Sequence, residues 1–363
     1  MQFIDLKSRH QLIGDKINAR IQKVMEHGQF ILGPEVREVE EKLAQYTGSK
    51  HCVTVSSGTD SLLIALMALS VGAGDEVITV PYTWISTAEV IALLGAKPVF
   101  VDIRPDTWNM DETLLEAAIT DKTKAIMPVS IYGQCSDMDA INAIAQKYNL
   151  PVIEDAAQSF GATYKGKKSC NLSTIGSTSF FPSKPLGCYG DGGALFSNDD
   201  ELVEKFRWIR VHGQERKHHH PILGINGRMD TIQAAILLEI LEVFPDEVNK
   251  REKIGQTYSE GLAHLEGLAT PSIGEHNTSV CAQYTILSEQ REQIQQSLKK
   301  KDIPSVSYYS IPLHLQTVFE ILGHQKRDFP VAEEVADECL SLPISPYLSA
   351  QDQSQVIEAI CAS

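Results

Sequence analysis

Between residues 50 and 200, short apolar runs alternate with amphipathic segments, and this alternation constrains the fold more than any other feature. Seven runs rich in Val, Ile or Phe have the length of buried strands: His51–Val55, Glu76–Val80, Lys97–Val101, Lys124–Val129, Pro151–Asp155, Ser177–Phe181 and Gly193–Ser197. Between the early runs lie helical patterns: Ser61–Leu69, Thr87–Leu94, Asp111–Ala118 and Asp137–Tyr148. Such alternation builds a mostly parallel sheet with helices on both faces. We predict an α/β domain with seven strands.

After residue 200 the pattern changes and predicts a second, smaller domain. Asp200–Arg210 and Asp230–Phe244 are typical of helices, and Pro245 is expected to end the latter. Further predicted elements are the helices Val248–Leu265, Glu289–Lys300, Ala332–Leu340 and Ala350–Ala362 and the strand Val280–Leu287. We therefore predict a large domain over residues 1–245, including the N-terminal segment, and a small C-terminal α+β domain over residues 246–363.

Charge and cysteine content exclude several classes of protein. The formal net charge is -15, and such a chain repels nucleic acid and anionic membrane surfaces. The longest apolar stretch, Leu62–Leu69, is too short to span a membrane. The seven cysteines form no Cys-x-x-Cys pair, and Met1–Lys7 lacks the features of a secretory signal. We expect a cytoplasmic protein with free thiols and with neither nucleic acid nor membrane as a partner.

The segment Ser179–Gly187, followed by the Gly-rich stretch Gly190–Ala194, carries the strongest chemical signal. Lys184 comes just past a predicted strand, and glycines let the loop approach a ligand closely. A lysine in apolar company at the edge of an α/β sheet loses solvation, which lowers its pKa and activates it toward a carbonyl. A surface lysine in a flexible loop is the alternative, which the flanking prolines and glycines disfavour.

Two further loops add a carboxylate and an aromatic ring. Asp155 ends the strand Pro151–Asp155, at the edge where open α/β sheets place their ligands. The ring nitrogen of pyridoxal phosphate (PLP) needs such a carboxylate, because the protonated ring is the electron sink. Trp84 follows the second strand and can stack on a cofactor face. Read separately, Asp155 could be a helix N-cap and Trp84 a core residue.

The loop Ser56–Ser61 follows the first strand and opens a helix. Free backbone N–H groups and the helix dipole favour an anion there, although ordinary helix capping explains the same residues. Taken together, the four loops follow strands whose ends meet at one edge of the sheet. They offer a phosphate cradle, an aromatic lid, a carboxylate and a lysine, which together predict a PLP site.

These motifs resemble the DegT/DnrJ/EryC1/StrS family of PLP-dependent sugar aminotransferases, which have the fold-type-I aminotransferase architecture. The similar blocks cover nearly the whole chain: Phe3–Lys7, Gly28–Pro34, Ser56–Asp60, Glu154–Gly161, Ser179–Ala194, Gly224–Gln233 and Tyr309–His314. The resemblance implies that Lys184 forms the Schiff base with PLP and that Asp155 pairs with the pyridine nitrogen. It places the remaining cofactor contacts on Trp84 and Gln158 at the ring and on Gly58, Thr59 and Ser179 at the phosphate.

The resemblance also implies a homodimer with shared active sites. Asn226 would reach the phosphate in the partner subunit's site, and Arg228 the substrate there, as a bidentate donor to a carboxylate or phosphate. Tyr309, Tyr308 and His314 would contact the sugar, although close relatives often carry His where this chain has Tyr308. Members that replace the lysine with histidine are dehydratases, so Lys184 favours transamination.

Within the family, Val129–Cys135 and Phe180–Gly193 are most similar to enzymes that aminate UDP-2-acetamido-2-deoxy-3-oxo-glucuronate for O-antigen and lipopolysaccharide biosynthesis. We expect a UDP-linked keto sugar as acceptor and L-glutamate as donor. A 4-keto-6-deoxy nucleotide-sugar aminotransferase and a non-enzymatic regulator on the same fold remain the alternatives. His218–His220 has no Cys or carboxylate at ligand spacing, and we interpret it as a loop rather than a metal site.

Overall fold

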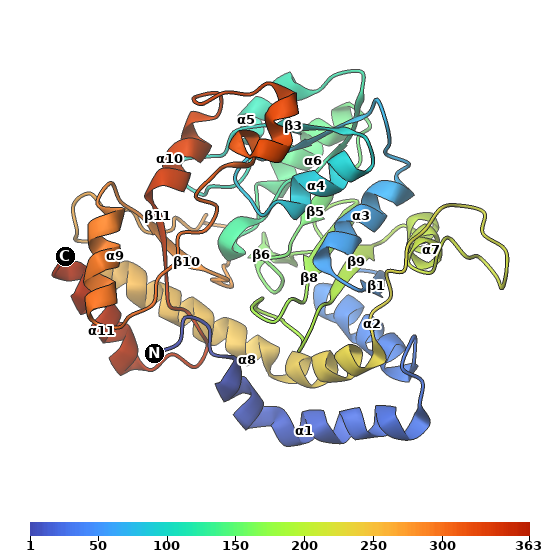
Figure 1. The fold of residues 1–363 in the computed structure, drawn as a ribbon, viewed down its shortest axis with the longest axis horizontal. Helices are drawn as coiled ribbons and strands as arrows, with labels where there is room; N and C mark the ends of the chain where they lie inside the picture. The colour runs from blue at the N-terminus through green and yellow to red at the C-terminus, as the bar shows by residue number, and fades with distance from the viewer.

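A computed structural model describes all residues 1–363, and its central layer has the predicted α/β architecture (Figure 1). One group of strands contains β3 (Lys97–Phe100), β2 (Glu76–Thr79) and β4 (Thr123–Ile126). The other contains β5 (Ile153–Asp155), β8 (Ile175–Ser179), β9 (Gly193–Ser197) and β1 (His51–Val55). Parallel bridges from Ile126 to Val152 and from Val129 to Asp155 join β4 to β5. The seven predicted strands therefore form one layer.

Strand direction determines where the loops of this layer meet. The pairs β2–β3, β2–β4 and β5–β8 are parallel. Only β9 is reversed, because it pairs antiparallel with both β8 and β1. The prediction of a mostly parallel sheet is confirmed, and β1, β2, β5 and β8 all end at the same edge.

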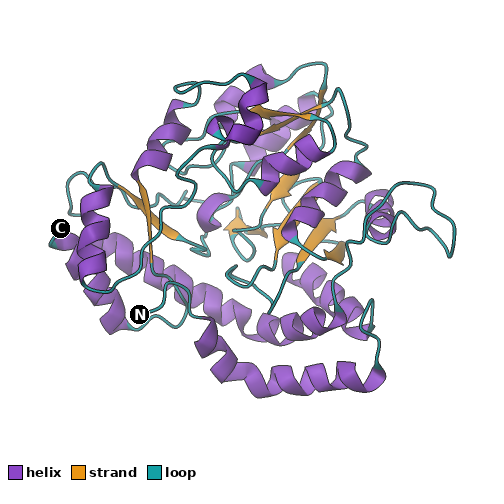
Figure 2. Cartoon of the chain, in the orientation of Figure 1, coloured by secondary structure: helices purple, strands orange, loops and turns teal.

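Helices cover both faces of the sheet, as Figure 2 shows in purple around the orange strands. On one face, α1 (Leu6–His27), α2 (Pro34–Thr47) and α8 (Thr231–Leu262) pack on Phe160, Phe180 and Phe196. On the other, α3 (Gly58–Ala68), α4 (Ser86–Leu93) and α7 (Asp200–Ile209) bury Val53, Val55 and Leu195. The short α5 (Glu112–Leu115) and the longer α6 (Met138–Lys147) lie near β3 in Figure 1.

The C-terminal residues build a separate small layer. An antiparallel pair, β10 (Tyr284–Leu287) and β11 (Cys339–Leu342), carries α9 (Arg291–Lys300), α10 (Pro330–Glu338) and α11 (Ala350–Cys361). Tyr258, Tyr284 and Leu342 are among the residues of its own hydrophobic core. The predicted α+β character of this part is present.

Helix α8 corrects the prediction that Pro245 ends a helix. One 32-residue helix runs through Pro245, so the two helices expected at 230–244 and 248–265 are a single element. Proline removes one backbone donor, but the residues around it, Phe244 and Glu247, stay buried and keep the helix packed. The domain boundary predicted between residues 245 and 246 falls inside this helix, which connects the two parts of the molecule in Figure 1. That boundary stays a prediction.

Smaller differences concern segments with weak patterns. No helix was predicted for residues 6–47, where α1 and α2 lie, and the hairpin of β6 (Thr163–Tyr164) and β7 (Lys167–Lys168) was not predicted either. The helix expected at Ala332–Leu340 ends at Glu338, and β11 begins directly after it. All seven cysteines are free thiols, as expected. None of the helices combines the length and apolar character needed to cross a bilayer.

Candidate active site

A cavity of about 390 Å³ opens at the edge where β1, β2, β5 and β8 end. Nine of the residues predicted to form the site line it: Gly58, Thr59, Trp84, Asp155, Gln158, Ser179, Lys184, Tyr308 and Tyr309. They come from loops as far apart in the sequence as residues 58 and 309. The fold therefore brings together the four loops singled out in the sequence and adds a wall from the C-terminal part.

Asp155 lies at the inner end of this cavity and is only 5% exposed. Thr87 Oγ1 donates to its Oδ2 at 2.8 Å, and the amide of Ala157 donates to its Oδ1 at 3.2 Å. Burial raises the pKa of the Asp155 carboxyl, while these two donors and the positive charge of Lys184 oppose the rise. The carboxylate is thus held in one orientation next to the lysine.

Lys184 is partly buried and lines the same cavity. Desolvation lowers the pKa of its ammonium group to about 8, against the opposing pull of the Asp155 carboxylate. Its backbone is fixed by a turn in which the Lys184 amide donates to the Phe181 carbonyl at 2.8 Å. Near neutral pH this amine therefore loses its proton far more readily than a surface lysine does, as a nucleophile or general base requires.

A row of aromatic residues and amides forms the wall beside Asp155. Gln158 Nε2 donates to the Tyr309 hydroxyl at 2.9 Å, and its Oε1 accepts from the Tyr132 amide at 2.9 Å. The Tyr309 and Tyr132 rings are stacked 6.1 Å apart. Both residues have left-handed backbones, with φ of 58° and 55°. A strained backbone at two neighbouring aromatic residues is common where a site is pre-formed.

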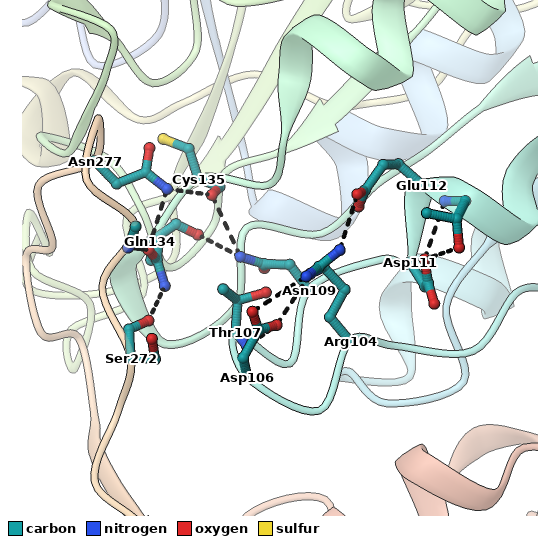
Figure 3. Close-up of polar contacts among 12 residues, drawn as sticks. Arg104, Asp106, Thr107, Asn109, Asp111, Glu112, Gln134, Cys135, Ser272 and Asn277 are labelled. Atoms are coloured by element: carbon teal, nitrogen blue, oxygen red, sulfur yellow. Dashed lines mark hydrogen bonds and ion pairs between the residues drawn. The ribbon is translucent and has the colours of Figure 1, made fainter.

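A network of amide side chains stabilises the turn that carries Tyr132, and Figure 3 shows its members Asn109, Gln134 and Asn277. Asn109 Oδ1 accepts from the Ile131 amide at 2.9 Å, and Asn109 Nδ2 donates to the Gln134 and Cys135 carbonyls at 3.3 Å each. Asn277 Nδ2 donates to the Cys135 carbonyl at 3.0 Å. These bonds fix the segment Val129–Cys135, one of the two segments whose sequence resembles enzymes that aminate a 3-keto uronate.

The N-terminus of α3 meets the end of β8 at the opposite side of the cavity. Ser57 Oγ accepts from the Asp60 amide at 3.0 Å, and the amides of Gly58 and Thr59 at the start of the helix have no intrahelical acceptor. A Cβ on Gly58 would lie 2.6 Å from Ser179 Cβ, so only glycine allows this close approach. Backbone donors and the Ser179 hydroxyl together make an anion cradle.

Trp84 lies at the mouth of the cavity and is 61% exposed. It also lines an adjoining groove of about 300 Å³ with Tyr309, Ile311 and Leu313. An indole that exposes this much apolar surface beside a cavity is available to stack on a flat ligand.

The remaining predicted residues lie elsewhere in this chain. Asn226 and Arg228 line a different cavity, of about 420 Å³, which shares Asp191 with the first. Arg228 Nε is buried and has no hydrogen-bond acceptor within the chain. His314 is 1% exposed, does not line the Lys184 cavity, and lies 3.0 Å from a Glu333 carboxylate oxygen.

Thr87 and Gln283 are among the residues that line the Lys184 cavity but were not predicted as site residues from the sequence. The sequence pattern predicts Thr87 only as the first residue of a helix. In the structure its hydroxyl is also the buried hydrogen-bond partner of Asp155. Gln283 precedes β10 and reaches the cavity from the C-terminal part. Thr87 lies one helical turn beyond Trp84, a spacing that places both at one helix N-terminus. No local pattern marks Gln283.

Comparison with known proteins identifies relatives along the whole chain. The model of the DegT/DnrJ/EryC1/StrS aminotransferase family matches residues 11–361. A UDP-2-acetamido-2-deoxy-3-oxo-D-glucuronate aminotransferase from Pseudomonas aeruginosa is 55% identical over 363 residues, which cover 100% of this chain and 99% of that protein. A pleiotropic regulatory protein from Geobacillus stearothermophilus is 46% identical, covering 98% of this chain and 96% of its own length.

Among solved structures, that of ntda from Bacillus subtilis with bound cofactor PMP resembles this chain closely. The TM-score is 0.90 at 32% sequence identity, and the match covers 96% of this chain and 81% of that one. This agreement extends over both the seven-stranded layer and the C-terminal part.

Proposed function

The chain belongs to the DegT/DnrJ/EryC1/StrS aminotransferase family, and from this premise we propose that it moves an amino group from L-glutamate to a UDP-linked keto sugar. The acceptor is the 3-keto carbon of a 2-acetamido-3-oxo-glucuronate, a substrate supported by the 55% identity to the Pseudomonas aeruginosa enzyme. The observation that carries the chemistry is the presence of Lys184 and Asp155 in one cavity. The enzyme is a PLP-dependent sugar aminotransferase.

The donor set of the cavity fits PLP. The cradle at the start of α3, with Gly58, Thr59 and Ser179, suits a phosphate. The buried carboxylate of Asp155 suits a protonated ring nitrogen, and Lys184 is the one lysine that lines the cavity. Bound PLP supplies the electron sink for the electron pair that remains when the amino-acid Cα loses its proton.

The side chains then have distinct tasks. Asp155, fixed by Thr87 and the Ala157 amide, keeps a proton on the ring nitrogen. Lys184 Nζ, with its pKa lowered to about 8, accepts the proton from Cα and returns it as a general acid. Gln158 and Trp84 line the cavity, where Gln158 would lie near the ring oxygen of bound PLP and Trp84 would cover its ring and exclude water.

The residues outside the cavity are assigned to the partner subunit's site. In a homodimer, Asn226 reaches the partner's phosphate, and Arg228 binds the carboxylate or diphosphate of the partner's substrate. The buried, unpartnered Nε of Arg228 supports this role, because it leaves a donor for a ligand. Tyr308 and Tyr309 contact the sugar. His314 is buried against Glu333 outside the cavity, so we assign it no direct contact with the sugar.

The test uses the purified protein, PLP and isotopically labelled L-glutamate with two acceptors in parallel. Mass spectrometry is expected to detect the label on the UDP-linked 3-keto uronate, together with release of 2-oxoglutarate. Labelling only of a 4-keto-6-deoxy nucleotide sugar would contradict the proposed acceptor and establish the alternative aminotransferase. Labelling with another amino acid but not with glutamate would contradict the proposed donor.

A regulatory function is the second candidate, because the relative from Geobacillus stearothermophilus is named a pleiotropic regulatory protein. A regulator without enzymatic activity has no need of a lysine with its pKa lowered to about 8 next to a buried carboxylate. Failure to bind PLP would favour regulation over transamination.

A further inference from the structure

A buried ion pair connects α1 to α8 beneath the Lys184 loop. Arg9 is 3% exposed, and it contacts Glu247 through two bonds, Nε to Oε1 at 2.9 Å and Nη2 to Oε2 at 2.7 Å. The two helices run side by side (Figure 1). Buried charges cost much of what they gain by pairing, so stability alone does not account for this pair.

Arg9 makes one further bond, and its acceptor lies in the loop of the proposed catalytic lysine. Its Nη2 donates to the carbonyl oxygen of Pro185 at 3.0 Å. Pro185 directly follows Lys184 and has no backbone donor of its own. Before it, the Lys184 amide is fixed by the Phe181 carbonyl, and after it the Cys188 amide donates to Phe180. Arg9 thus holds the backbone between these two anchors.

Glu247 connects this arrangement to the C-terminal part of the chain. The Tyr347 hydroxyl donates to Glu247 Oε1 at 2.5 Å. Arg251, one helical turn further along α8, is buried as well and donates to the Cys281 carbonyl at 3.2 Å. The carboxylate that orients Arg9 is therefore itself held from a third region of the molecule.

We propose that Arg9, oriented by Glu247, is a positioning residue for Lys184: it fixes the Pro185 carbonyl so that the lysine amine faces Asp155. Arg9 itself does not line the cavity. The inference rests on the proposed function of Lys184. A guanidinium suits this task because its planar fork serves the carboxylate and a carbonyl at once, which an ammonium group cannot reproduce.

A second ion pair between the same two helices provides a matched control. Arg20 Nε in α1 pairs with Glu239 Oε1 in α8 at 2.5 Å, and Arg20 also contacts Glu38 in α2. None of these groups bonds to the Lys184 loop. Arg20→Met therefore removes a connection between α1 and α8 while leaving the lysine backbone as it is.

The experiment compares holoenzymes of the wild type, Arg9→Met, Arg9→Lys and Arg20→Met. Because a displacement of about 1 Å can cost about 10²-fold in rate, we expect Arg9→Met to lower kcat about tenfold to a hundredfold. We expect KM for glutamate to change by less than about twofold, because the substrate contacts remain. The pH midpoint of the visible cofactor band should shift as well, because that midpoint depends on how the lysine faces Asp155.

Arg9→Lys should lie between the wild type and Arg9→Met, and Arg20→Met should match the wild type in kcat and pH midpoint even where its Tm falls. If Arg9→Met does not fold, the kcat and pH midpoint of Arg9→Lys test the proposal instead. Folded Arg9 variants with wild-type kcat and pH midpoint would overturn the proposal, as would an Arg20→Met enzyme with the defects of Arg9→Met. A wild-type protein without the visible band would refute the proposed function itself, so the two failures are distinguishable.

Discussion

The two ends of the predicted site differ in how much of their bonding one chain supplies. Around Lys184, the polar atoms of Asp155 and Gln158 are buried and have partners within the same chain. In the segment 224–230, Asn226 is exposed and Arg228 has a buried donor without a partner. In the first region Asp155 and Gln158 are bonded within a single chain, although Gln283 Oε1 at the cavity wall has no partner, and in the second region Arg228 has bonding capacity that the chain leaves unused.

On this difference rests the proposal that Asp155 and Lys184 act in their own chain and that Asn226 and Arg228 serve the partner subunit's site. Buried polar groups are normally satisfied, so the unpaired Nε of Arg228 supports the proposed contact with a ligand or partner, although Arg210 and Arg251 have an unpaired Nε as well. In the homodimer that we propose, each 224–230 segment lies against the other subunit's cavity. The predictions that follow test the two regions against each other.

The largest effect is expected in the region around Lys184 and Asp155. Lys184→Ala should lower turnover by about 10³-fold or more, because it removes the group that transfers the proton. It should also abolish the visible absorbance of the enzyme with PLP. Rates are measured as 2-oxoglutarate release, with Lys217→Ala, an exposed lysine in a loop, as the control. Near-normal turnover of Lys184→Ala would refute the assignment.

The second prediction joins the two regions in one experiment. Lys184→Ala and Arg228→Ala should each be inactive, but subunits mixed after unfolding and refolding together should regain roughly one quarter of wild-type activity, since half of the dimers carry one intact shared site. Refolding each variant alone is the control. If the mixture stays inactive, Arg228 acts in its own chain and the comparison between the regions fails.

Asp155→Asn tests the electrostatic coupling between Asp155 and Lys184. The Asp155 carboxylate favours the charged form of Lys184, so its removal should move the pKa of the lysine below its value of about 8. Turnover should fall by about 10²-fold, because general acid–base contributions have this size. The lysine pKa is measured from the pH dependence of reagent labelling at Lys184. A pKa that stays at about 8 or rises would contradict the account.

The smallest effect is expected at the wall of the cavity. Tyr309→Phe removes the bond from Gln158 Nε2, which is worth about 1 kcal/mol and corresponds to about fivefold in KM or kcat for the sugar. The reaction with glutamate alone should be nearly unchanged. Tyr148→Phe, far from the cavity on an exposed helix end, serves as the control. An equal loss with glutamate alone would assign Tyr309 to the cofactor rather than to the sugar.

The parts of the fold that were predictable are those with a strong local pattern. The runs around β1, β2, β3 and β9 are short and mostly apolar, and each was placed within a residue or two of its observed bounds. Helix α1 was not predicted because it mixes charged residues with few apolar ones. Its stability comes from packing against α8, which the sequence pattern does not reveal. The prediction that Pro245 ends a helix was wrong because tertiary packing outweighs the local helix-breaking effect of proline.

In the site, chemistry tied to strand ends was predictable, and contacts between distant segments were not. Lys184 and Asp155 follow strands, and their convergence follows from sheet topology. The bonds from Thr87 to Asp155 and from Arg9 to Pro185 join residues 68 and 176 positions apart, and no spacing in the sequence indicates them. The resemblance to the family supplied the expectation about Arg228, but only the structure places it in a different cavity.

The central claim, that Lys184 and Asp155 form a working PLP site, is tested most directly by the absorbance spectrum of the purified protein before and after addition of L-glutamate. The account predicts a visible band with PLP that shifts to shorter wavelength with glutamate, and that is missing in Lys184→Ala. A wild-type protein that shows no band after incubation with PLP would contradict it.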